Sequence, residues 1–477
     1  MDVHIAVLAA GKGTRMHSAR PKVLHRVGGL PLIEHVLRTA DALQPRSTSV
    51  VVGHQADSVR EALSRHPRLK FVVQEPQLGT GHAVLQVESA LKNAQGTLVV
   101  LSGDVPLLTS STLKRFIQHH VTSGSSMTVL TMVADDPSGY GRIVRGGDSG
   151  DQFACVVEER DANSQQQLIR EVNSGIYAFA LDGLFEAIRR IGTENAQREH
   201  YLPDAVTIFR KAGRRVEAVP TPTIDEVSGI NTRAELAAVN RIMRDEKNAA
   251  LMAAGVTLED PATAYIDVDV TIGPDTIIHP GVSLEGSTSI GSGCEIHSGV
   301  RIVNSRIGDR ATILNHCVLV EARVAADARI GPFAHLRKDA DVRERAHVGN
   351  FVELKNTVLG AGSKSMHLAY LGDATIGEKV NVGAGTITCN YDGEQKLHTV
   401  IEDGAFIGSD SQLIAPVTVG RNAYIGTGTT IREDVPPDSL AVSAGKQRNI
   451  ENWVTERKKK QGARNAEVST LTAREKS

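Results

Sequence analysis

The stretch TIGPDTIIHPGVSLEGSTSIGSGCEIHSGVRI, residues 271–302, decides the fold of the second half of the chain. An aliphatic residue returns in it at every sixth position, from Ile272 to Ile302. A helix, with about 3.6 residues per turn, does not sustain that spacing, and neither does a flat strand with a period of about two. In a left-handed parallel β-helix of hexapeptide repeats, one aliphatic side chain per face points into a three-sided prism. We therefore predict such a β-helix.

The register extends well beyond this stretch, with two slips of one residue. It runs from Ile307 to Leu319, from Val324 to Leu354, through Ile376 and Val382, and from Ile401 to Ile431. One coil is too thin to bury a core of its own, so the coils must stack. The aliphatic pattern fails at 360–372 (GAGSKSMHLAYLG) and at 388–399 (TCNYDGEQKLHT). We expect the second of these segments to leave the prism as a loop.

The first half has a different sequence pattern. Short apolar runs alternate with amphipathic segments up to about residue 230. Strands that are apolar throughout and separated by helices predict a parallel sheet covered on both faces, an α/β Rossmann-like domain. Ligands of such sheets bind beyond the carboxyl ends of the strands. The expected strands are 5–10, 49–52, 69–73 and 97–101, and the expected helices are 32–43, 57–65 and 82–92.

A chain of 477 residues is too long for one compact core. We expect a first domain at 1–233, a helical linker at 234–254 and the β-helix domain at 255–477. The linker is rich in helix formers and carries its apolar residues on one stripe. The tail from about residue 454 has little to bury, and we expect it to be disordered.

Composition narrows the function classes. A net charge of −2 provides no strong positive field and so argues against general nucleic-acid binding. The four cysteines form no Cys-x-x-Cys pair, so free thiols in a reducing compartment are expected. The N-terminus has no secretory pattern, and no apolar run is long enough to cross a bilayer. We expect a cytoplasmic protein without membrane insertion.

A glycine-containing loop, LAAGKGTRM at residues 8–16, follows the first predicted strand. The third glycine of a Rossmann fingerprint is absent, because Met16 stands there, and the Gly-Lys-Ser/Thr of a P-loop is absent as well. A structural turn remains one interpretation. Arg15 and Lys22, however, add two cations beside glycine amides, a combination that suits a triphosphate.

Asp104 lies just past the apolar strand of LVVLSGDVP, residues 98–106. A lone Asp after a strand is often a turn residue or a helix cap. A carboxylate in this position also suits Mg²⁺, which prefers oxygen ligands. The motifs around it decide between the two interpretations.

Six motifs occur in the order typical of sugar-phosphate nucleotidyltransferases. They are LAAGKGTRM at 8–16, PKVLH at 21–25, QLGTGH at 77–82, GDVP at 103–106, GYGR at 139–142 and NSG at 173–175. Together with the repeat, the chain resembles the bifunctional N-acetylglucosamine-1-phosphate uridylyltransferase/glucosamine-1-phosphate N-acetyltransferase family, from about residue 3 to 453. This implies acetylation of glucosamine 1-phosphate by acetyl-CoA, then UMP transfer from UTP to N-acetylglucosamine 1-phosphate. The product would be the precursor of bacterial peptidoglycan and lipopolysaccharide.

The resemblance implies residue roles in the first domain. Asp104 and Asn231 would hold Mg²⁺, although Asn231 alone would be interpreted as a turn residue. Lys22 and Arg15 would neutralise phosphate, and Gly141, Glu158 and Asn173 would contact the amino sugar. The remaining nucleotide-binding residues would be Leu8, Ala9, Ala10, Gly11, Gln74, Gly79, Thr80, Ser102 and Gly103.

The resemblance also implies an acetyltransferase site on the β-helix. His367 would be the general base, a role that a neutral imidazole suits near pH 7. The sugar phosphate would be bound by Arg337, Lys355, Tyr370 and Asn381, and acetyl-CoA by Ala384, Asn390, Tyr391, Ser409 and Thr427. Solvated or corner positions are the alternatives for Lys355 and Asn381. Family members associate as trimers, so a homotrimer is expected.

The chain departs from the family pattern in three places. Ser102 stands where Tyr is frequent, and Thr427 where Ala is frequent. Ala444 replaces an Arg that serves the coenzyme phosphates in some relatives, which leaves Lys446 or Arg448 as the alternative cation. The competing readings are a monofunctional nucleotidyltransferase with a structural β-helix, and a scaffold without chemistry.

Overall fold

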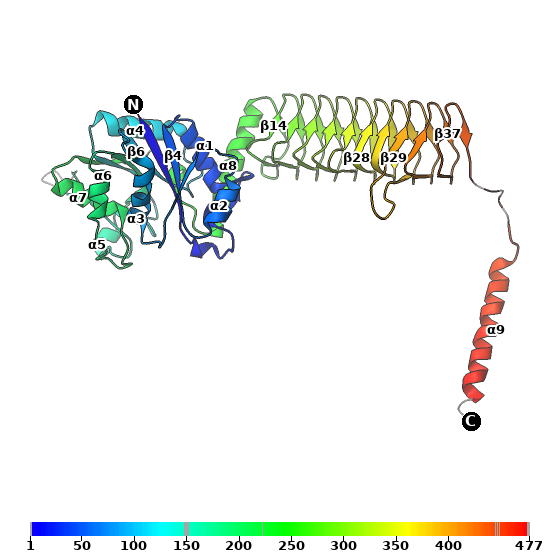
Figure 1. Cartoon of the computed structure of the whole chain (residues 1–477), viewed down its shortest axis with the longest axis horizontal. Coiled ribbons are helices and arrows are strands. Elements are labelled where there is room, and N and C mark those ends of the chain that lie inside the picture. The colour runs from blue at the N-terminus through cyan, green and yellow to red at the C-terminus, as the bar shows by residue number, and fades with distance from the viewer. Residues whose placement is uncertain are drawn as a thin grey trace. The chain divides into compact units, whose positions relative to one another are not determined.

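The computed structural model describes residues 2–146, 152–221, 223–443, 445, 447 and 449–474, without the side chains of 465–474 (Figure 1). The chain forms two compact units, Met1–Arg306 and Ile307–Ser477. The first contains a sheet with its helices, the long helix α8 (Arg233–Ala253) and the first coils of a β-helix. The second contains further coils and a C-terminal helix. The unit boundary therefore lies within the repeat, and not at the predicted linker.

The sheet of the first unit has nine strands, seven of them in the order β11-β7-β10-β6-β1-β4-β5. The hairpin partners β8 and β9 lie off this path and join it through β10. The bounds are β1 (Val3–Ala9), β4 (Ser47–Val52), β5 (Lys70–Val73), β6 (Thr97–Ser102), β7 (Met127–Val133), β8 (Arg142–Gly146), β9 (Gln152–Val157), β10 (Glu171–Ala180) and β11 (Val216–Pro220).

The four predicted strands are present as β1, β4, β5 and β6, and they pair in parallel. The sheet as a whole is mixed, however, because β10 runs antiparallel to β6 and β7. The chain reverses direction in the hairpin of β8 and β9, which pair antiparallel. Because β8 also runs antiparallel to β10, β9 and β10 run in the same direction, and the single-turn helix α5 (Ser164–Gln167) lies between them.

Side chains of β1 alternate between two hydrophobic cores, one on each face of the sheet. Ile5 and Val7 belong to the core shared with α1 (Leu32–Asp41), α2 (Ala56–Ala62) and α4 (Ser110–Thr122). Ala6 belongs to the core shared with α3 (Thr80–Leu85), α6 (Leu184–Arg189) and α7 (Ala205–Lys211). Both faces are therefore covered by helices, as predicted.

Short elements complete this domain. The 3-10 turns are η1 (Thr14–Met16), η2 (Lys22–Leu24), η3 (Gln86–Leu91), η4 (Leu202–Asp204) and η5 (Asp225–Val227), and a small ribbon is formed by β2 (Arg26–Val27) and β3 (Leu30–Pro31).

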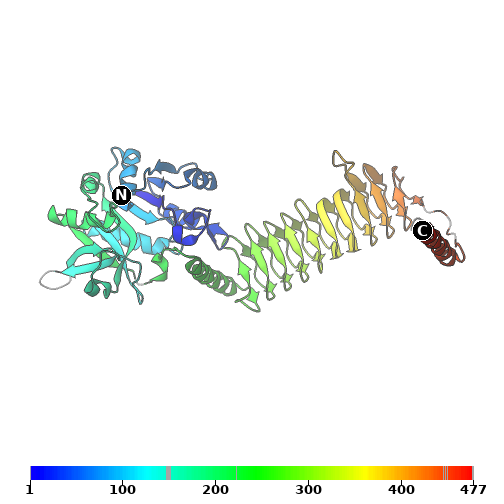
Figure 2. The same cartoon turned by 90° about the horizontal axis from the view of Figure 1, so that it is seen from below.

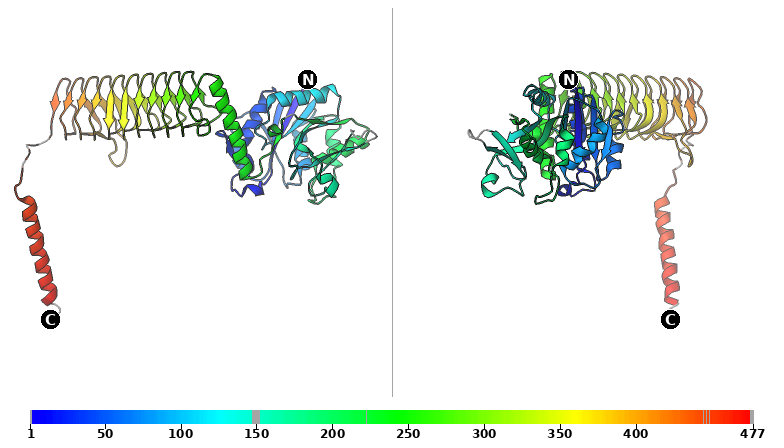
Figure 3. Two further views of the ribbon diagram at one scale, coloured as in Figure 1. Left: turned by 180° about the vertical axis from the view of Figure 1, so that it is seen from behind. Right: turned by 60° about the vertical axis from the view of Figure 1, so that its left-hand side comes forward.

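Helix α8, green in Figure 3, begins at a capping box. The Thr232 hydroxyl accepts a hydrogen bond from the Glu235 amide, and the Glu235 carboxylate accepts one from the Thr232 amide. The first coils attach to both the helix and the sheet domain. Lys247 donates to the carbonyl oxygens of Val268 and Val270, and Arg38 of α1 forms a two-pronged ion pair with Asp269. These contacts explain why the first coils belong to the first unit.

The first coils have three faces of stacked parallel strands. One face holds β12 (Thr257–Leu258), β15 (Ile277–Ile278) and β18 (Glu295–Ile296), and the next holds β13 (Tyr265–Ile266), β16 (Ser283–Glu285) and β19 (Arg301–Val303). The third holds β14 (Thr271–Ile272) and β17 (Ser289–Ile290). Partners such as Ile278 and Ile296 are separated by one coil of 18 residues.

The second unit repeats this arrangement over further coils (Figure 2). One face holds β21 (Thr312–Ile313), β24 (Arg329–Ile330), β27 (His347–Asn350), β29 (Lys364–His367), β31 (Asn381–Val382), β34 (Phe406–Ile407), β37 (Tyr424–Ile425) and β39 (Leu440–Ala441). The other two faces hold β22 (Val318–Val320), β23 (Arg323–Val324), β25 (His335–Leu336), β26 (Asp341–Val342), β28 (Glu353–Leu359), β30 (Tyr370–Ile376), β32 (Ile387–Cys389), β33 (Thr399–Ile401), β35 (Gln412–Ile414), β36 (Val417–Val419) and β38 (Thr430–Ile431). The strand β20 (Arg306–Ile307) lies at the unit boundary.

The predicted six-residue register forms the core of the prism. Leu284, Ile313 and Leu336 are fully buried, as are the other register positions between them apart from small residual exposure. The coils approach closely at corner glycines. A Cβ on Gly349 would lie 1.8 Å from the Met366 carbonyl oxygen, so no larger residue fits there. The predicted left-handed parallel β-helix is confirmed.

The interruption at 360–372 does not break the coil. The strand β29 continues the stack, and Ser365 takes the inward place beneath Val348 that an aliphatic residue occupies elsewhere. Ser365 is completely buried, and its neighbours in the register, Leu359 and Leu371, remain inward. The aliphatic pattern of the sequence is therefore interrupted by a polar residue, whereas the repeat of the backbone continues.

The second interruption does leave the prism. The chain exits after β32 and returns at β33, which leaves residues 390–398 as a projecting loop (Figure 1). The tail differs from the expectation of disorder, because it forms helix α9 (Trp453–Arg474). Its residues up to 464 are exposed, so the helix follows from a high content of Glu, Lys, Arg, Gln and Ala and not from packing.

No helix in the described parts of the chain is long and apolar enough to span a membrane. All four cysteines carry free thiols. Burial raises the pKa of the Cys317 thiol to about 11.

Candidate active sites

The carboxyl ends of three parallel strands surround a cavity of about 480 Å³ in the first unit. Leu8 of β1 pairs with Ser102 of β6, and the Leu8 carbonyl oxygen accepts a hydrogen bond from the Gly103 amide. This junction brings most of the predicted nucleotide-binding residues to one cavity. Its lining includes Leu8, Ala9, Ala10, Gly11, Lys22, Gln74, Gly79, Thr80, Ser102 and Asp104.

Two larger hollows lie elsewhere in the sheet domain. One, of about 690 Å³, lies at residues 41–48 and 65–69, and the other, of about 600 Å³, lies beside β11. Neither is lined by a predicted site residue. Size alone does not identify the site, whereas the position at the strand ends does.

Three predicted residues meet at the floor of this cavity. The Lys22 ammonium donates to the Asp104 carboxylate in an ion pair and to the Asn231 side-chain oxygen at 3.1 Å. The Asp104 carbonyl oxygen also accepts from the Ile230 amide, which ties the Asn231 segment to the end of β6. Two side-chain oxygens therefore converge on one cation. Such hard oxygen donors are the type that Mg²⁺ prefers.

The glycine loop approaches this cluster closely. Gly13 has a φ of +58°, and a Cβ there would lie 2.7 Å from the Lys22 Cβ. A side chain at this position would therefore displace Lys22. A Cβ on Gly11 would meet nothing within 4 Å, so the backbone of the loop faces open space. This leaves room for a ligand against its amides.

The opposite wall is built from Gln74, Gly79 and Thr80. Buried Gln74 donates from its side-chain nitrogen to the Gly79 carbonyl oxygen at 2.9 Å. The Thr80 hydroxyl accepts from the Leu202 amide at 3.0 Å. The wall is thus held by its own hydrogen bonds before any ligand enters.

The three residues expected to bind the amino sugar also lie together. The Asn173 amide donates to the Gly141 carbonyl oxygen at 2.8 Å, and a Cβ on Gly141 would lie 3.1 Å from a Glu158 carboxylate oxygen. A Cβ on Gly175 would lie 3.2 Å from the Ser102 hydroxyl. Gly141, Glu158 and Asn173 therefore lie beside the end of β6, which is two residues before Asp104.

Glu158 has an unusual protonation equilibrium. Burial, together with the negative charges of Asp204 and Asp161, raises the pKa of its carboxyl group from 4.5 to about 7, against the opposing effect of Arg142. A carboxyl group with this pKa is partly protonated near neutral pH. It can then donate a hydrogen bond as well as accept one.

Some residues differ from expectation. Arg15 is exposed and does not line the cavity, whereas Lys12, Gln77 and Glu199 do. Lys12 belongs to the quoted glycine motif and could have been chosen from it. Glu199 carried no signal, because it is placed by long-range backbone bonds of its neighbour His200 to Leu78 and Gly81.

On the β-helix, His367 ends strand β29 and is exposed. Its Nδ1 lies 2.8 Å from the side-chain oxygen of Asn350, directly across the parallel pair of β27 and β29. An amide oxygen only accepts hydrogen bonds, so Nδ1 carries the proton. The Nε2 lone pair is therefore free, as a general base requires. The sequence did not identify Asn350.

Three of the four expected sugar-phosphate ligands lie on the neighbouring face. Arg337 and Lys355 follow the paired positions Leu336 and Leu354, so they stack on successive coils. Arg337 forms an ion pair with Glu353 at 2.7 Å, and Glu353 pairs with Tyr370 on the next coil. The fourth, Asn381, lies on the face of His367, opposite Lys364.

Asp373 and the projecting loop complete this face. Asn390 is buried and donates to both the Asp373 carboxylate and the Tyr370 hydroxyl. Burial alone would raise the pKa of Asp373, but hydrogen bonds from Asn356 and Asn390 and nearby lysine charges lower it. Contact with the Lys396 ammonium lowers the pKa of Lys355. The face therefore carries Arg337, Lys355 and Lys396 beside the carboxylates of Glu353 and Asp373.

The expected acetyl-CoA residues follow one corner of the prism. The Ala384 carbonyl oxygen accepts from the Asp410 amide, next to Ser409, and the Ser409 carbonyl oxygen accepts from the Gly428 amide, next to Thr427. The Leu368 carbonyl oxygen accepts from Gly385, so His367 lies at the head of this column. Tyr391 is exposed on the loop. Ala444, Lys446 and Arg448 lie outside the described residues.

Comparisons with known proteins agree with this two-part construction. Residues 5–199 match the MobA-like NTP transferase domain, and residues 269–304 and 398–433 match the bacterial transferase hexapeptide repeats. The fold and its matches define a nucleotidyltransferase joined to a hexapeptide-repeat transferase.

Curated relatives extend the match over nearly the whole chain. A bifunctional protein GlmU from Trichlorobacter lovleyi is 49% identical over 447 residues, 94% of this chain and 97% of that protein. Those of an Exiguobacterium species and of Koribacter versatilis are each 46% identical, over 95% and 96% of this chain and 99% and 97% of their own lengths. The chain belongs to the bifunctional GlmU family, which confirms the resemblance.

Proposed function

We propose that this chain makes UDP-N-acetylglucosamine in two reactions. It acetylates glucosamine 1-phosphate with acetyl-CoA and then transfers UMP from UTP to N-acetylglucosamine 1-phosphate. The observation that carries this proposal is the presence, in one chain, of a glycine-lined cavity with Lys22 and Asp104 and a β-helix histidine with a free Nε2. Family membership links the two chemistries.

In the nucleotidyl step, a phosphate oxygen of N-acetylglucosamine 1-phosphate attacks the α-phosphorus of UTP, and pyrophosphate leaves with the bonding electrons. Phosphate is a competent nucleophile, so no side chain needs to move a proton. The chain contributes positioning and charge neutralisation. The glycine loop holds the triphosphate, and Lys12 and Lys22 bring positive charge to it. Exposed Arg15 follows Thr14, which lines this cavity, and would add a further cation.

Mg²⁺ fits the same floor. The oxygens of Asp104 and Asn231 already gather around a positive charge, the Lys22 ammonium, so a hard divalent ion suits this donor set. When bound, Mg²⁺ would neutralise phosphate charge and orient the triphosphate.

The amino sugar lies against Gly141, Glu158 and Asn173. Partial protonation of Glu158 lets its carboxyl group donate to a sugar hydroxyl or accept from the acetamido N–H. A neutral Glu158 favours an N-acetylated sugar at this site over a cationic amine, which an ionised carboxylate would attract. With Glu158 neutral, nucleotidyl transfer would therefore follow acetylation.

In the acetyl step, the amine of glucosamine 1-phosphate reacts in its neutral form, and His367 Nε2 removes a proton from the attacking nitrogen. The amine nitrogen forms a bond to the thioester carbonyl carbon, the carbon–sulfur bond breaks, and coenzyme A leaves with the proton returned by His367. Asn350 holds the required tautomer. Arg337 and Lys355 supply cations for the sugar phosphate, with Tyr370 and Asn381 beside them.

The acetyltransferase is proposed to work as a homotrimer. An exposed ridge of Phe333, Phe351 and Leu368 follows one corner of the second unit and ends beside His367. The rings of Phe333 and Phe351 stack at 5.4 Å, and Leu368 donates its amide to the Asn350 carbonyl oxygen. A neighbouring copy that covers this ridge would close the site that holds acetyl-CoA. A cytoplasmic location is proposed because the free thiols suit a reducing compartment.

The test uses the full chain with glucosamine 1-phosphate, acetyl-CoA, UTP and Mg²⁺, and omits one component at a time. UDP-N-acetylglucosamine should require all four, and N-acetylglucosamine 1-phosphate should bypass acetyl-CoA. Asp104→Ala should stop pyrophosphate release and leave acetylation intact. Failure of the wild type to acetylate would favour a nucleotidyltransferase whose β-helix is only structural.

A further inference from the structure

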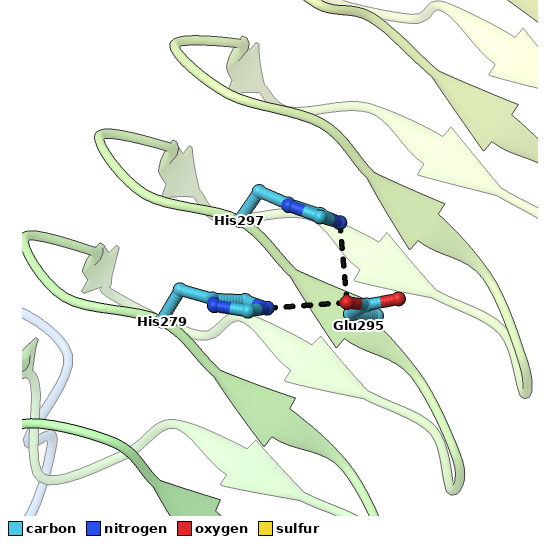
Figure 4. A group of neighbouring side chains, drawn as sticks. All are labelled: His279, Glu295 and His297. Atoms are coloured by element: carbon cyan, nitrogen blue, oxygen red, sulfur yellow. Dashed lines mark hydrogen bonds and ion pairs between the residues drawn. The ribbon is translucent and has the colours of Figure 1, made fainter.

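Three side chains with metal-binding chemistry meet on the first coils of the prism, apart from both candidate active sites. They are His279, Glu295 and His297 (Figure 4). His279 follows β15, Glu295 begins β18, and His297 follows β18 one coil of 18 residues after His279. A backbone hydrogen bond from the His279 amide to the Ile296 carbonyl oxygen fixes the two coils to each other. The stacking of coils therefore brings the three side chains together.

Both imidazole rings present Nε2 to one carboxylate oxygen. The distances to the Glu295 oxygen are 3.2 Å from His279 and 3.4 Å from His297. The rings lie nearly parallel, with centroids 4.6 Å apart and 15° between their planes. Zinc bonds of about 2.1 Å place neighbouring ligand atoms about 3.0 to 3.4 Å apart in octahedral or tetrahedral geometry. The two nitrogen-to-oxygen distances match that range, and the three ligand atoms all lie within 4.8 Å of one another.

The second nitrogen of His279 has a carboxylate partner of its own. Its Nδ1 lies 2.9 Å from a carboxylate oxygen of Glu259, on the preceding coil. A neutral imidazole has one N–H, so donation to Glu259 leaves the Nε2 lone pair facing the lone pairs of Glu295. Two such groups repel unless a proton or a metal ion lies between them. A carboxylate that orients a histidine from behind is the common outer partner of a metal site.

We infer that the chain binds one divalent transition-metal ion of the Zn²⁺ type through His279 Nε2, His297 Nε2 and a Glu295 carboxylate oxygen. Two imidazole nitrogens and one carboxylate suit Zn²⁺, whereas Mg²⁺ prefers oxygen ligands throughout. Both His side chains keep more than a fifth of their surface exposed, so an ion can enter from solvent. Three protein donors leave a position for water.

The bound ion links successive coils. Glu259 lies on the coil of β12, His279 on that of β15, and Glu295 and His297 on that of β18. The ion would therefore hold the first three coils together at the end of the prism. The first of these coils has no preceding coil to pack against. Other histidine–carboxylate contacts, such as His66 with Glu34 and His119 with Glu217, bring one imidazole to one carboxylate. No other group of three such donors is found in the described residues.

The experiment titrates chelator-treated full-length protein with Zn²⁺ at pH 7.5 by calorimetry, and repeats the titration with Co²⁺ by visible absorption. The wild type should bind one Zn²⁺ that excess Mg²⁺ does not displace. His279→Gln and His297→Gln should each weaken binding at least tenfold and remove the Co²⁺ bands. Glu259→Gln should weaken it by about 10- to 100-fold, since it removes only the orienting partner.

His119→Gln is the matched control, because it removes a histidine that also contacts a glutamate but belongs to no group of three such donors in the part of the chain that the structure describes. It should leave Zn²⁺ binding unchanged. Zn²⁺ should also raise the melting temperature of the wild type and not that of His297→Gln. The inference is overturned if the wild type binds no Zn²⁺, or if both His279→Gln and His297→Gln bind it as tightly as the wild type. None of these measurements depends on either proposed enzyme activity.

Discussion

The two candidate sites are built in opposite ways. The nucleotide site is a cavity at the edge of a sheet, lined by segments more than 180 residues apart, from Leu8 to Glu199. The acetyl site is a surface on a prism, where paired residues on successive coils are 17 or 18 positions apart, or 25 where the projecting loop intervenes. The first site encloses its cavity within one unit of the chain. The second spreads its residues over two neighbouring faces of the prism.

This difference shows what holds the functional residues of each site in position. In the cavity, Lys22, Asp104 and Asn231 hold one another, so a change in one disturbs the others. On the prism, the backbone repeat sets the spacing, and His367 depends on a single side-chain partner, Asn350. The predictions that follow test this contrast, and the first two measure both reactions of the same variant.

The largest effect is expected from His367→Ala. Loss of a general base should lower the acetyl-transfer rate by about 10²- to 10⁴-fold, because the amine is no longer deprotonated in the transition state. Coenzyme A release measures this rate. Uridylyl transfer, measured by pyrophosphate release, should be unchanged. Equal loss in both assays would contradict the separation of the two sites.

Lys22→Ala should have the next largest effect, in the opposite assay. Removal of the cation beside Asp104 should lower uridylyl transfer by about 10²- to 10³-fold, a typical cost of losing an electrostatic contact to the transition state. Acetyl transfer should be retained. Lys92→Ala, at an exposed position on the same domain, is the control and should retain both activities.

Glu158→Gln sharpens the contrast through pH. The folded pKa of Glu158, about 7, lies above its ordinary value of 4.5. The native carboxyl group therefore stabilises the fold below pH 4.5, and this contribution is lost as the pH rises through about 7. The variant does not titrate, so its unfolding free energy relative to the wild type should rise by up to roughly 3 kcal/mol between pH 5 and pH 8.

Urea unfolding of both proteins side by side measures this difference. Glu171→Gln provides a comparison of opposite sign. Burial alone would raise the pKa of Glu171, but hydrogen bonds from Arg145 and Thr131 lower it. Its stabilising contribution is therefore present above the unfolded pKa of 4.5 and is lost only as the pH falls below that value, so this comparison is made between pH 5 and pH 3. A constant difference between Glu158→Gln and the wild type would show that Glu158 is ionised throughout.

The smallest effect is expected from Asn350→Ala. Loss of one hydrogen bond that orients His367 should lower the turnover of acetyl transfer by about tenfold. Asn350→Asp keeps an acceptor and adds a negative charge that favours the imidazolium. It should recover most of the rate and shift the acid limb of the pH–rate profile upward. If the pH–rate profile of Asn350→Asp is the same as that of the wild type, Asn350 does not orient His367.

The β-helix could be predicted from the sequence because its core depends only on a fixed spacing of aliphatic residues. Each inward residue needs only to be aliphatic at a fixed spacing, so Leu284 and Leu336 could be placed in the core without knowledge of the rest of the fold. Ser365 shows the limit, since one inward polar residue hid a coil that is structurally continuous. The helix of the tail was missed because helix propensity acts there, while its described side chains, up to residue 464, are exposed.

The site residues divide in the same way. Lys22 and Asp104 stand in short motifs, and His367 stands in a segment that breaks the aliphatic pattern, so the resemblance could mark them. Asn350 and Glu199 carry no local signal. They are brought to their sites by strand pairing and by long-range backbone bonds, and that information is not contained in the neighbouring sequence.

The 18-residue coil has a consequence for how such a protein can change. Because the backbone bonds of each coil reach only the coils directly before and after it, an insertion at a corner, such as residues 390–398, leaves distant coils undisturbed. A whole coil added or deleted between the first coils and the acetyl site would translate that site along the prism axis and preserve its local geometry. The length of the prism can therefore change during evolution by one whole coil at a time.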